Sequence, residues 1–405
     1  MTLLCHMTMP HQVTVVRDLP ARVSSVSLFV DDQGASPSEW AGMLTTCTLC
    51  VSNSLVSLHL GRVCSSDADF MIALGSLVNL EQLTLEVRPS KQSSGFVCDL
   101  LALTTLRQLQ MLHLTCSTAV QLPLTPRIMS LACLAWPRLT SLALSVMGGS
   151  RLVPEALELL DTLSTLQRLS LLSSVGATGV RKPFVPINLA YLPAGLTELQ
   201  LEHATLAQPA KQTFPTLSAL HIRHSWLPGN TLEHLISSSP RLRSLGLSHM
   251  VDMSEVEMLS ALGHASRLER LTLAGTFLPA ISTPTANACI ERAERLGAAL
   301  SCTAGSLEDV AWEVVSDSTV PYEYLAECAY AFHNFHSLRR LCFGCSAAGA
   351  DVLSIHNKQG SKHGRGCNKL SKMLPLCSLA ILHKFDGCNE QDAHLQDDVM
   401  FAVCI

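Results

Sequence analysis

A short apolar pattern recurs along most of this 405-residue chain. In each copy an apolar residue is followed by two variable residues, a second apolar residue, one variable residue and a third apolar residue, as in Leu55, Leu58 and Leu60. Twelve copies follow one another at intervals of 21 to 39 residues, and leucine fills 30 of their 36 framework positions. Their first positions are Val23, Leu55, Leu80, Leu109, Leu139, Leu166, Leu196, Leu217, Leu242, Leu268, Leu307 and Leu338. Self-similarity at this period indicates stacked units that each bury an apolar edge against their neighbours.

Each copy predicts a short strand, because its last two framework residues alternate with variable ones as in a half-buried strand. Between the copies, apolar residues three and four apart give the spacing of a helix face. This helical spacing covers residues 69–77, 155–163, 231–236 and 256–262. The expected fold class is therefore α/β, with a parallel sheet on the inner side of an arc and helices on the outer side.

Two units depart from the common length. The unit that begins at Leu196 is only 21 residues long and contains Pro209 and Pro215, so we expect an extended or single-turn return instead of a helix. The longest unit carries an insertion between Leu273 and Leu307. Its proline- and threonine-rich turn and the helical spacing over 288–300 predict a loop followed by an enlarged outer helix.

The repeated pattern resembles that of the leucine-rich repeat family, whose core reads L-x-x-L-x-L-x-x-N/C-x-L. It is most similar to the ribonuclease-inhibitor-like and F-box-associated repeats, since Pro137, Pro215 and Pro240 each stand two residues before a first leucine. The resemblance implies a leucine-rich-repeat solenoid, a curved horseshoe with a parallel sheet on the concave side and helices on the convex side. The Asn/Cys slot departs from the family pattern and holds Ala204, Ser225, Thr276 or Ser346.

The pattern divides the chain into three parts. Residues 1–20 are an N-terminal segment expected to be partly disordered, and residues 21–346 are a leucine-rich-repeat domain of about twelve units. Residues 347–405 are a non-repeat C-terminal tail of low expected order, in which the apolar stretch 373–382 matches no repeat register.

Composition and charge narrow the range of expected partners and locations. The net charge of −5 and the lack of a basic run in the repeats argue against nucleic acid as the main partner. No apolar stretch reaches the ~18 residues of a spanning helix, and the first residues lack a signal-peptide core, so neither a membrane nor secretion is expected. The sixteen cysteines are scattered and are expected to stay reduced. The expected location is cytoplasmic, including cytoskeletal or axonemal assemblies.

The variable residues of the strands are the candidate binding residues. The third, fifth and seventh residues of each unit point away from the core and form the concave face. Arginine is enriched among the residues that dominate binding energy, and acidic residues complement it. The candidate partner-binding residues are Arg168, Glu198, Glu202, His221, Arg223, Arg270 and Arg340. The alternative interpretation is a solvated face with no partner at these positions.

Three histidines occupy the eighth residue of consecutive units. His203, His224 and His249 could stack into a ladder, because adjacent strands lie about 4.8 Å apart. Such a ladder could hold a metal or form a pH-sensitive contact, and the alternative is coincidence in a chain with sixteen histidines. In this column, neither the three histidine units nor the units that flank them hold an Asp or a Cys, so no metal site and no cofactor are predicted.

The motifs of catalysis are missing from the sequence. No glycine-rich phosphate loop, G-x-S-x-G or H-E-x-x-H occurs, so no catalytic residue is predicted and the chain is not expected to be an enzyme. The expected function is a non-catalytic scaffold that binds another protein on its concave face. The alternative implied by the resemblance is a substrate-recognition subunit of a cullin-type (SCF) ubiquitin ligase with a missing or truncated F-box. Only about twenty residues precede the first strand-like segment, which is too few for an intact F-box.

Overall fold

The computed structural model describes thirteen segments of the chain. They are residues 2–7, 24–30, 54–63, 68–87, 100–116, 126–146, 154–173, 185–207, 212–228, 230–274, 286–315, 331–346 and 378–382. The chain forms two compact units. Unit 1 comprises Met1–Arg243 with Met250–Asp252, and unit 2 comprises Ser244–His249 with Met253–Ile405.

The strands of unit 1 lie side by side in the order in which they occur along the chain. Every neighbouring pair is parallel, so after each strand the chain crosses back to the end of the sheet at which that strand began. These strands are β1 (Thr2–Met7), β2 (Ser25–Val30), β3 (Ser57–Val63), β4 (Gln82–Val87), β5 (Met111–Cys116), β6 (Ser141–Val146), β7 (Arg168–Ser173), β9 (Glu198–Glu202) and β11 (Ala219–Arg223).

Unit 2 repeats this arrangement. Its strands are also parallel and in chain order: β12 (Ser244–Ser248), β13 (Arg270–Ala274), β14 (Asp309–Val315), β15 (Arg340–Ser346) and β16 (Ser378–Leu382). All twelve strands expected from the apolar triplets are present, which confirms that part of the sequence interpretation. Long parallel sheets with helices are compatible with a solenoid-like α/β fold.

Strand β16 corrects one sequence interpretation. The stretch 373–382 was expected to match no repeat register, but β16 pairs with β15, and Leu379 lies opposite Leu341. Leu376, Leu379 and Ile381 have the spacing of the framework, and Pro375 stands just before them. The expectation was wrong because the triplet follows a long stretch without repeats, so its spacing alone did not show that it continues the sheet. Strand β1, which pairs with β2, was also not predicted.

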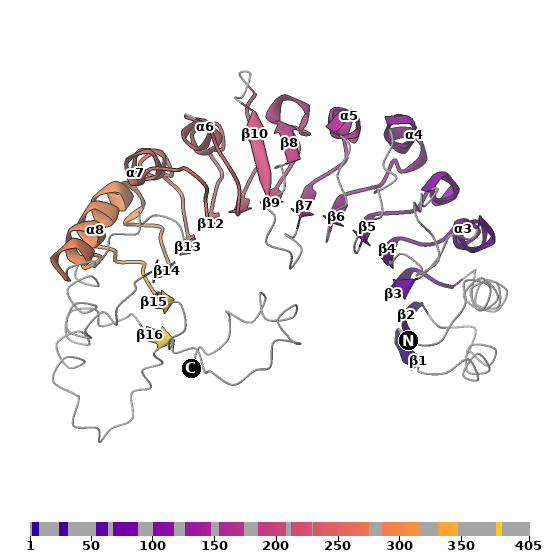
Figure 1. Ribbon diagram of the computed structural model, residues 1–405, viewed down its shortest axis with the longest axis horizontal. Coiled ribbons are helices and arrows are strands. Elements are labelled where there is room, and N and C mark those ends of the chain that lie inside the picture. Colours follow the sequence, from indigo (N-terminus) through magenta and orange to yellow (C-terminus); the bar gives the residue numbers. More distant parts are fainter. Residues whose placement is uncertain are drawn as a thin grey trace. The chain divides into compact units, whose positions relative to one another are not determined.

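Helices and short 3-10 turns connect the strands and, in Figure 1, lie on one side of each unit's sheet. In unit 1 they are α3 (Ala68–Gly75), η2 (Leu100–Thr105), α4 (Pro126–Ala135), α5 (Pro154–Leu157), η3 (Leu160–Thr162), η4 (Leu189–Tyr191) and α6 (Thr231–Ser237). In unit 2 they are α7 (Glu255–Leu262), α8 (Ala286–Ala299) and η5 (Leu300–Thr303). The helices expected over 69–77, 231–236, 256–262 and 288–300 are confirmed. The stretch 155–163 instead forms the short helix α5 followed by the 3-10 turn η3.

The core lies between the sheet and these connections. Along β6 the side chains alternate between half-buried and buried, and the two framework leucines Leu142 and Leu144 are 1% and 0% exposed. The backbone fixes their register, because the carbonyl of Gln110 accepts hydrogen bonds from the N–H groups of Thr140 at 2.9 Å and Ser141 at 3.0 Å. The same two-donor contact recurs at the start of strand after strand, so each unit is aligned on the one before it.

The short unit that begins at Leu196 returns as an extended segment, as expected from its prolines. Strand β10 (Ala204–Ala207) pairs in parallel with β8 (Val185–Asn188), and single bridges extend this second sheet to Trp226 and Val251. Ser225, in the slot where the resembled pattern has Asn or Cys, is fully buried. Its hydroxyl accepts from the N–H of Ala204 at 3.1 Å and donates to the carbonyl of Arg223 at 2.7 Å. The serine therefore links two successive units through their backbones.

Replacing Leu142 with alanine should lower the free energy of unfolding by roughly 2–5 kcal/mol, because it leaves a cavity between neighbouring units. The same replacement of Ser141 with alanine, on the opposite face of β6, should change the free energy of unfolding by less than about 0.5 kcal/mol. Urea unfolding followed by circular dichroism measures both variants. Equal effects would contradict the assignment of the two faces.

Replacing Ser225 with alanine should lower the free energy of unfolding by about 1–3 kcal/mol, because the buried N–H of Ala204 loses its hydroxyl acceptor. The control is Ser237→Ala on α6, since that exposed hydroxyl donates only to a carbonyl within its own helix. Thermal melting of the two variants provides the comparison. A Ser225→Ala protein as stable as the control would mean that this hydrogen bond does not hold the units together.

Candidate functional site

The face of each sheet that is opposite the helices is called the open face here. The open face carries the variable residues of each strand, and these side chains are mostly half-buried, whereas the framework leucines on the other face are buried. Because neighbouring strands are in register, equivalent residues form straight rows across the sheet. One such row in unit 1 runs through His59, Thr84, His113, Ala143, Ser170, Gln200 and His221.

The predicted partner-binding residues of unit 1 gather on β7, β9 and β11. Arg168 lies opposite Glu198 across β7 and β9, and Glu202 lies opposite Arg223 across β9 and β11. Arg168 is exposed, and no ion pair joins it to Glu198 within the described part of the chain. His221 is the neighbour of Gln200 in the central row. The structure thus brings these five residues together on three adjacent strands.

Arg270 and Arg340, the remaining predicted residues, lie on the open face of unit 2 with Asp309 between them. The register pairs Arg270 with Asp309 and Asp309 with Arg340. The guanidinium of Arg340 makes a two-point contact with the carboxylate of Asp309, with 2.7 Å between Nε and Oδ1 and a second bond from Nη2 to Oδ2. Asp309 had been placed on this face from its position in the unit, but its pairing with Arg340 was not foreseen.

In the central row, the charge of His59 on β3 affects the pKa of His113 on β5, across β4. Burial lowers the pKa of His113, and the charge of His59 lowers it further. Burial also lowers the pKa of His59, while the carboxylate of Glu86 acts in the opposite direction. Thr115 provides a hydroxyl 3.4 Å from Nε2 of His113. This pair was missed from the sequence because the two residues stand on strands separated by a third strand.

The predicted histidine ladder is formed in part. The rings of His203 and His224 stack with their centroids 5.0 Å apart and their planes 7° from parallel. Both residues have left-handed backbones, with φ of 51° and 49°, and His249 of unit 2 has φ of 48°. Histidine is among the residues that adopt this conformation most readily, which suits the turn at the end of a strand. Burial lowers the pKa of His203.

The described residues include no group of three or more His, Cys, Asp or Glu side chains placed to hold a metal ion. Three of the described cysteines, Cys116, Cys133 and Cys302, are free thiols. Burial raises the pKa of Cys116 to about 12, so this thiol stays protonated at neutral pH and is a poor nucleophile.

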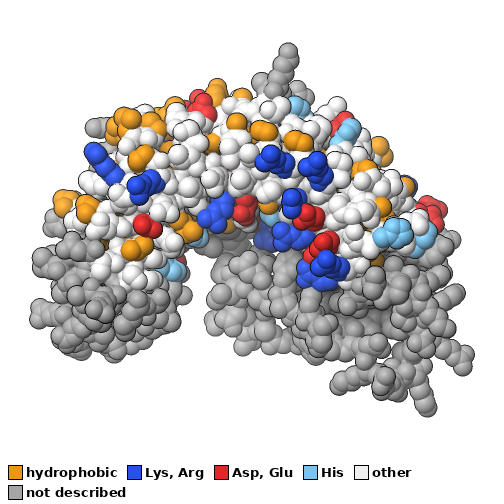
Figure 2. Space-filling model, turned by 180° about the vertical axis from the view of Figure 1, so that it is seen from behind, with side chains coloured by type: hydrophobic (Ala, Val, Ile, Leu, Met, Phe, Trp, Pro, Cys, Tyr) orange, Lys and Arg blue, Asp and Glu red, His pale blue; other side chains and the backbone are white. Residues whose placement is uncertain are grey.

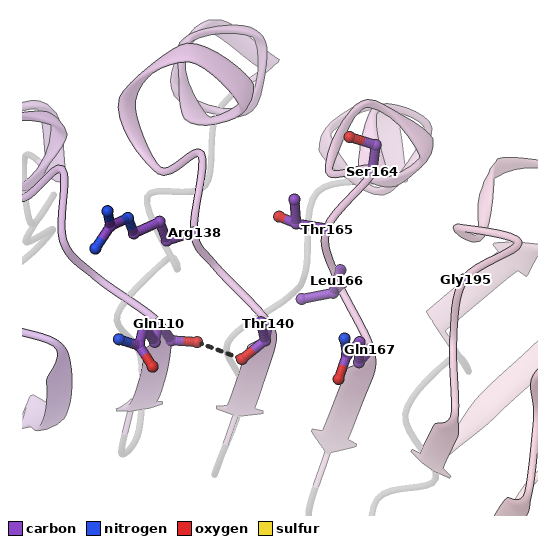
Figure 3. A pocket seen from close by; sticks show the side chains of 8 residues that line it. All are labelled: Gln110, Arg138, Thr140, Ser164, Thr165, Leu166, Gln167 and Gly195. Atoms are coloured by element: carbon purple, nitrogen blue, oxygen red, sulfur yellow. Dashed lines mark hydrogen bonds between the residues drawn. The ribbon is translucent and has the colours of Figure 1, made fainter.

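A polar groove lies where strands β5, β6, β7 and β9 begin, and its volume is about 500 Å³ (Figure 3). Its lining residues are Gln110, Arg138, Thr140, Ser164, Thr165, Leu166, Gln167 and Gly195. Several of their polar groups are already used within the fold. Arg138 donates to Oε1 of Gln108 at 2.6 Å, and the hydroxyl of Thr140 donates to the carbonyl of Gln110 at 3.2 Å. Part of the hydrogen-bonding capacity of the groove is therefore already used within the fold.

No family model matches this chain, and no curated protein matches it either. Within the described residues, none of the helices has the length and apolar character needed to cross a membrane. In the view of Figure 2, basic side chains lie next to acidic ones, so this side of the molecule carries a mixed charge.

The variant His59→Gln should raise the pKa of His113, because it removes a nearby positive charge. The pKa should remain below the ordinary value of 6.5, since burial is the larger cause of its depression. NMR titration of the histidine ring protons measures this shift, with His264→Gln in unit 2 as the control. An unchanged pKa in His59→Gln would contradict the coupling between β3 and β5.

The lowered pKa of His113 makes the stability of the fold depend on pH. The unfolded chain binds a proton at His113 more readily than the folded chain does, so folding favours the neutral ring. The contribution of His113 to stability is complete above about pH 6.5 and declines as the pH falls from there toward the folded-state pKa.

Proposed function

We propose that this chain is a leucine-rich-repeat solenoid whose open face, the concave face of such a horseshoe, binds another protein without catalysing a reaction. The observation that carries the proposal is the set of straight rows of half-buried, largely polar side chains on the open face of parallel strands. Rows of this kind offer a partner a broad surface with adjustable polar contacts, while the leucine framework keeps the surface rigid.

The size of the surface suits a protein partner. At about 4.8 Å per strand, the row from β3 to β11 spans on the order of 30 Å, and a five-residue strand extends roughly 16 Å. The projected area is therefore about 500 Å², the same order as the roughly 800 Å² that each side of a stable protein interface buries. The exposed arginines Arg168 and Arg270 supply side chains that commonly dominate binding energy.

The distribution of polar side chains on the open face also supports the proposal. Catalysis needs a nucleophile, acid or base held within hydrogen-bond distance of its partner in a cleft. On the open face of unit 1 the polar groups are instead distributed along whole rows. The thiol of Cys116 is buried and its pKa is raised to about 12, so it is a poor nucleophile. These observations favour recognition over catalysis.

Affinity purification from a native extract tests the proposal. The full-length double variant Arg168→Glu/Arg270→Glu should lose at least one protein that the unmodified chain recovers, by about tenfold or more, because charge reversal at a binding arginine replaces attraction with repulsion. The matched control is Arg138→Glu/Arg267→Glu, which makes the same charge change at exposed residues just before β6 and β13.

Identical protein sets for all three chains would contradict binding at the open face. Recovery of a cullin-type ligase adaptor that the open-face variant retains would instead favour the ubiquitin-ligase role, since that adaptor would then bind elsewhere on the chain. Equal melting temperatures of the variants establish that folding is not the cause of any loss.

A further inference from the structure

We propose that the open face of unit 2 binds an acidic peptide segment of the partner, with Arg270 as the residue that receives its carboxylate. The proposal rests on the proposed function, since it assigns a chemical class to the partner of the same face. Three adjacent strands, β13, β14 and β15, carry the charged residues concerned.

The register places Arg270, Asp309 and Arg340 in one row, each about 4.8 Å from the next strand. A carboxylate between two guanidiniums could be shared equally, but here it is not. Asp309 accepts from both Nε and Nη2 of Arg340, so each of its carboxylate oxygens already has a charged donor. The two-point geometry is the strongest arrangement that an arginine and a carboxylate form.

Arg270 is thereby left with an unbalanced positive charge. Its side chain is exposed, and among the described residues it makes neither an ion pair nor a side-chain hydrogen bond. The pair formed by Arg340 and Asp309 is neutral as a unit, so Arg270 supplies the net charge of this row. A guanidinium in this position can bind an incoming carboxylate through two parallel hydrogen bonds.

The strand beside Arg270 carries small, uncharged residues on the open face. Ser244 of β12 lies opposite Arg270, and Gly246 lies opposite Thr272. Ser244 and Gly246 are buried, and they have a small side chain and none, respectively, so neither contributes a charge or a long side chain beside the arginine. A peptide carboxylate can therefore approach the exposed guanidinium of Arg270 from solvent without meeting a competing charge on β12. A basic segment would instead be repelled by Arg270, and the carboxylate of Asp309 is already paired with Arg340.

The test uses the full-length protein and a fluorescein-labelled peptide of alternating glutamate and serine. Fluorescence anisotropy compares this peptide with an analogue in which every glutamate is replaced by glutamine. The unmodified protein should bind the glutamate peptide more tightly, and Arg270→Glu should weaken that binding about tenfold or more. The control Arg267→Glu, at an exposed arginine that precedes β13, should change it by less than about twofold.

A second variant should act in the opposite direction. Asp309→Asn removes the negative charge beside Arg270 and releases the guanidinium of Arg340, so binding of the glutamate peptide should strengthen by about threefold. A side chain with only a structural role would not strengthen binding when it is removed. Circular dichroism and thermal melting verify that each variant is folded.

The outcomes separate this inference from the proposed function. Equal binding of the two peptides, or unchanged binding by Arg270→Glu, overturns the acidic-peptide site even if the double variant Arg168→Glu/Arg270→Glu loses its protein partner in the affinity purification. If that double variant keeps every partner, binding at the open face is itself overturned, whatever the peptides do.

Discussion

The burial of two framework side chains by each strand is the constraint on which the other features depend. In β6 these are Leu142 and Leu144, and equivalent leucines in β5 and β7 lie opposite them in register. A shift of one residue would turn both leucines to the open face and bring Ala143 and a serine into the core. Each strand is therefore held in one register, and the rows of the open face follow from that register.

Hydrogen bonds between successive units reinforce the same alignment. The hydroxyls of Thr140, Thr197 and Ser218 each donate to a carbonyl of the preceding unit, at 3.2, 3.1 and 2.9 Å. Ser225 performs a similar task from a buried position in the slot where the resembled pattern has Asn or Cys. The hydroxyls of Thr140, Thr197 and Ser218 thus add a further donor to carbonyls that already accept two backbone N–H groups, whereas Ser225 supplies an acceptor for the N–H of Ala204.

The charges of the open face depend on the strand register. Arg340 neutralises Asp309, whereas Arg270, one strand away, keeps its charge. On unit 1 the imidazoles of His59 and His113 lie near enough for the charge of one to lower the pKa of the other. In both units, residues about thirty or more positions apart in the sequence acquire shared electrostatic behaviour only because their strands are aligned.

Apolar periodicity predicts the twelve strands, the long helix α8 and the outward direction of Arg168 and Arg270, because it is a local property that each unit expresses separately. The triplet Leu376, Leu379 and Ile381 of β16 is also present in the sequence, but it stands apart from the regular array. In contrast, the pairing of Arg340 with Asp309 and the stacking of the rings of His203 and His224 follow only from the folded arrangement. Those contacts depend on which side chains the register brings side by side and on the rotamers they adopt, and neither is encoded in the spacing of leucines along the chain.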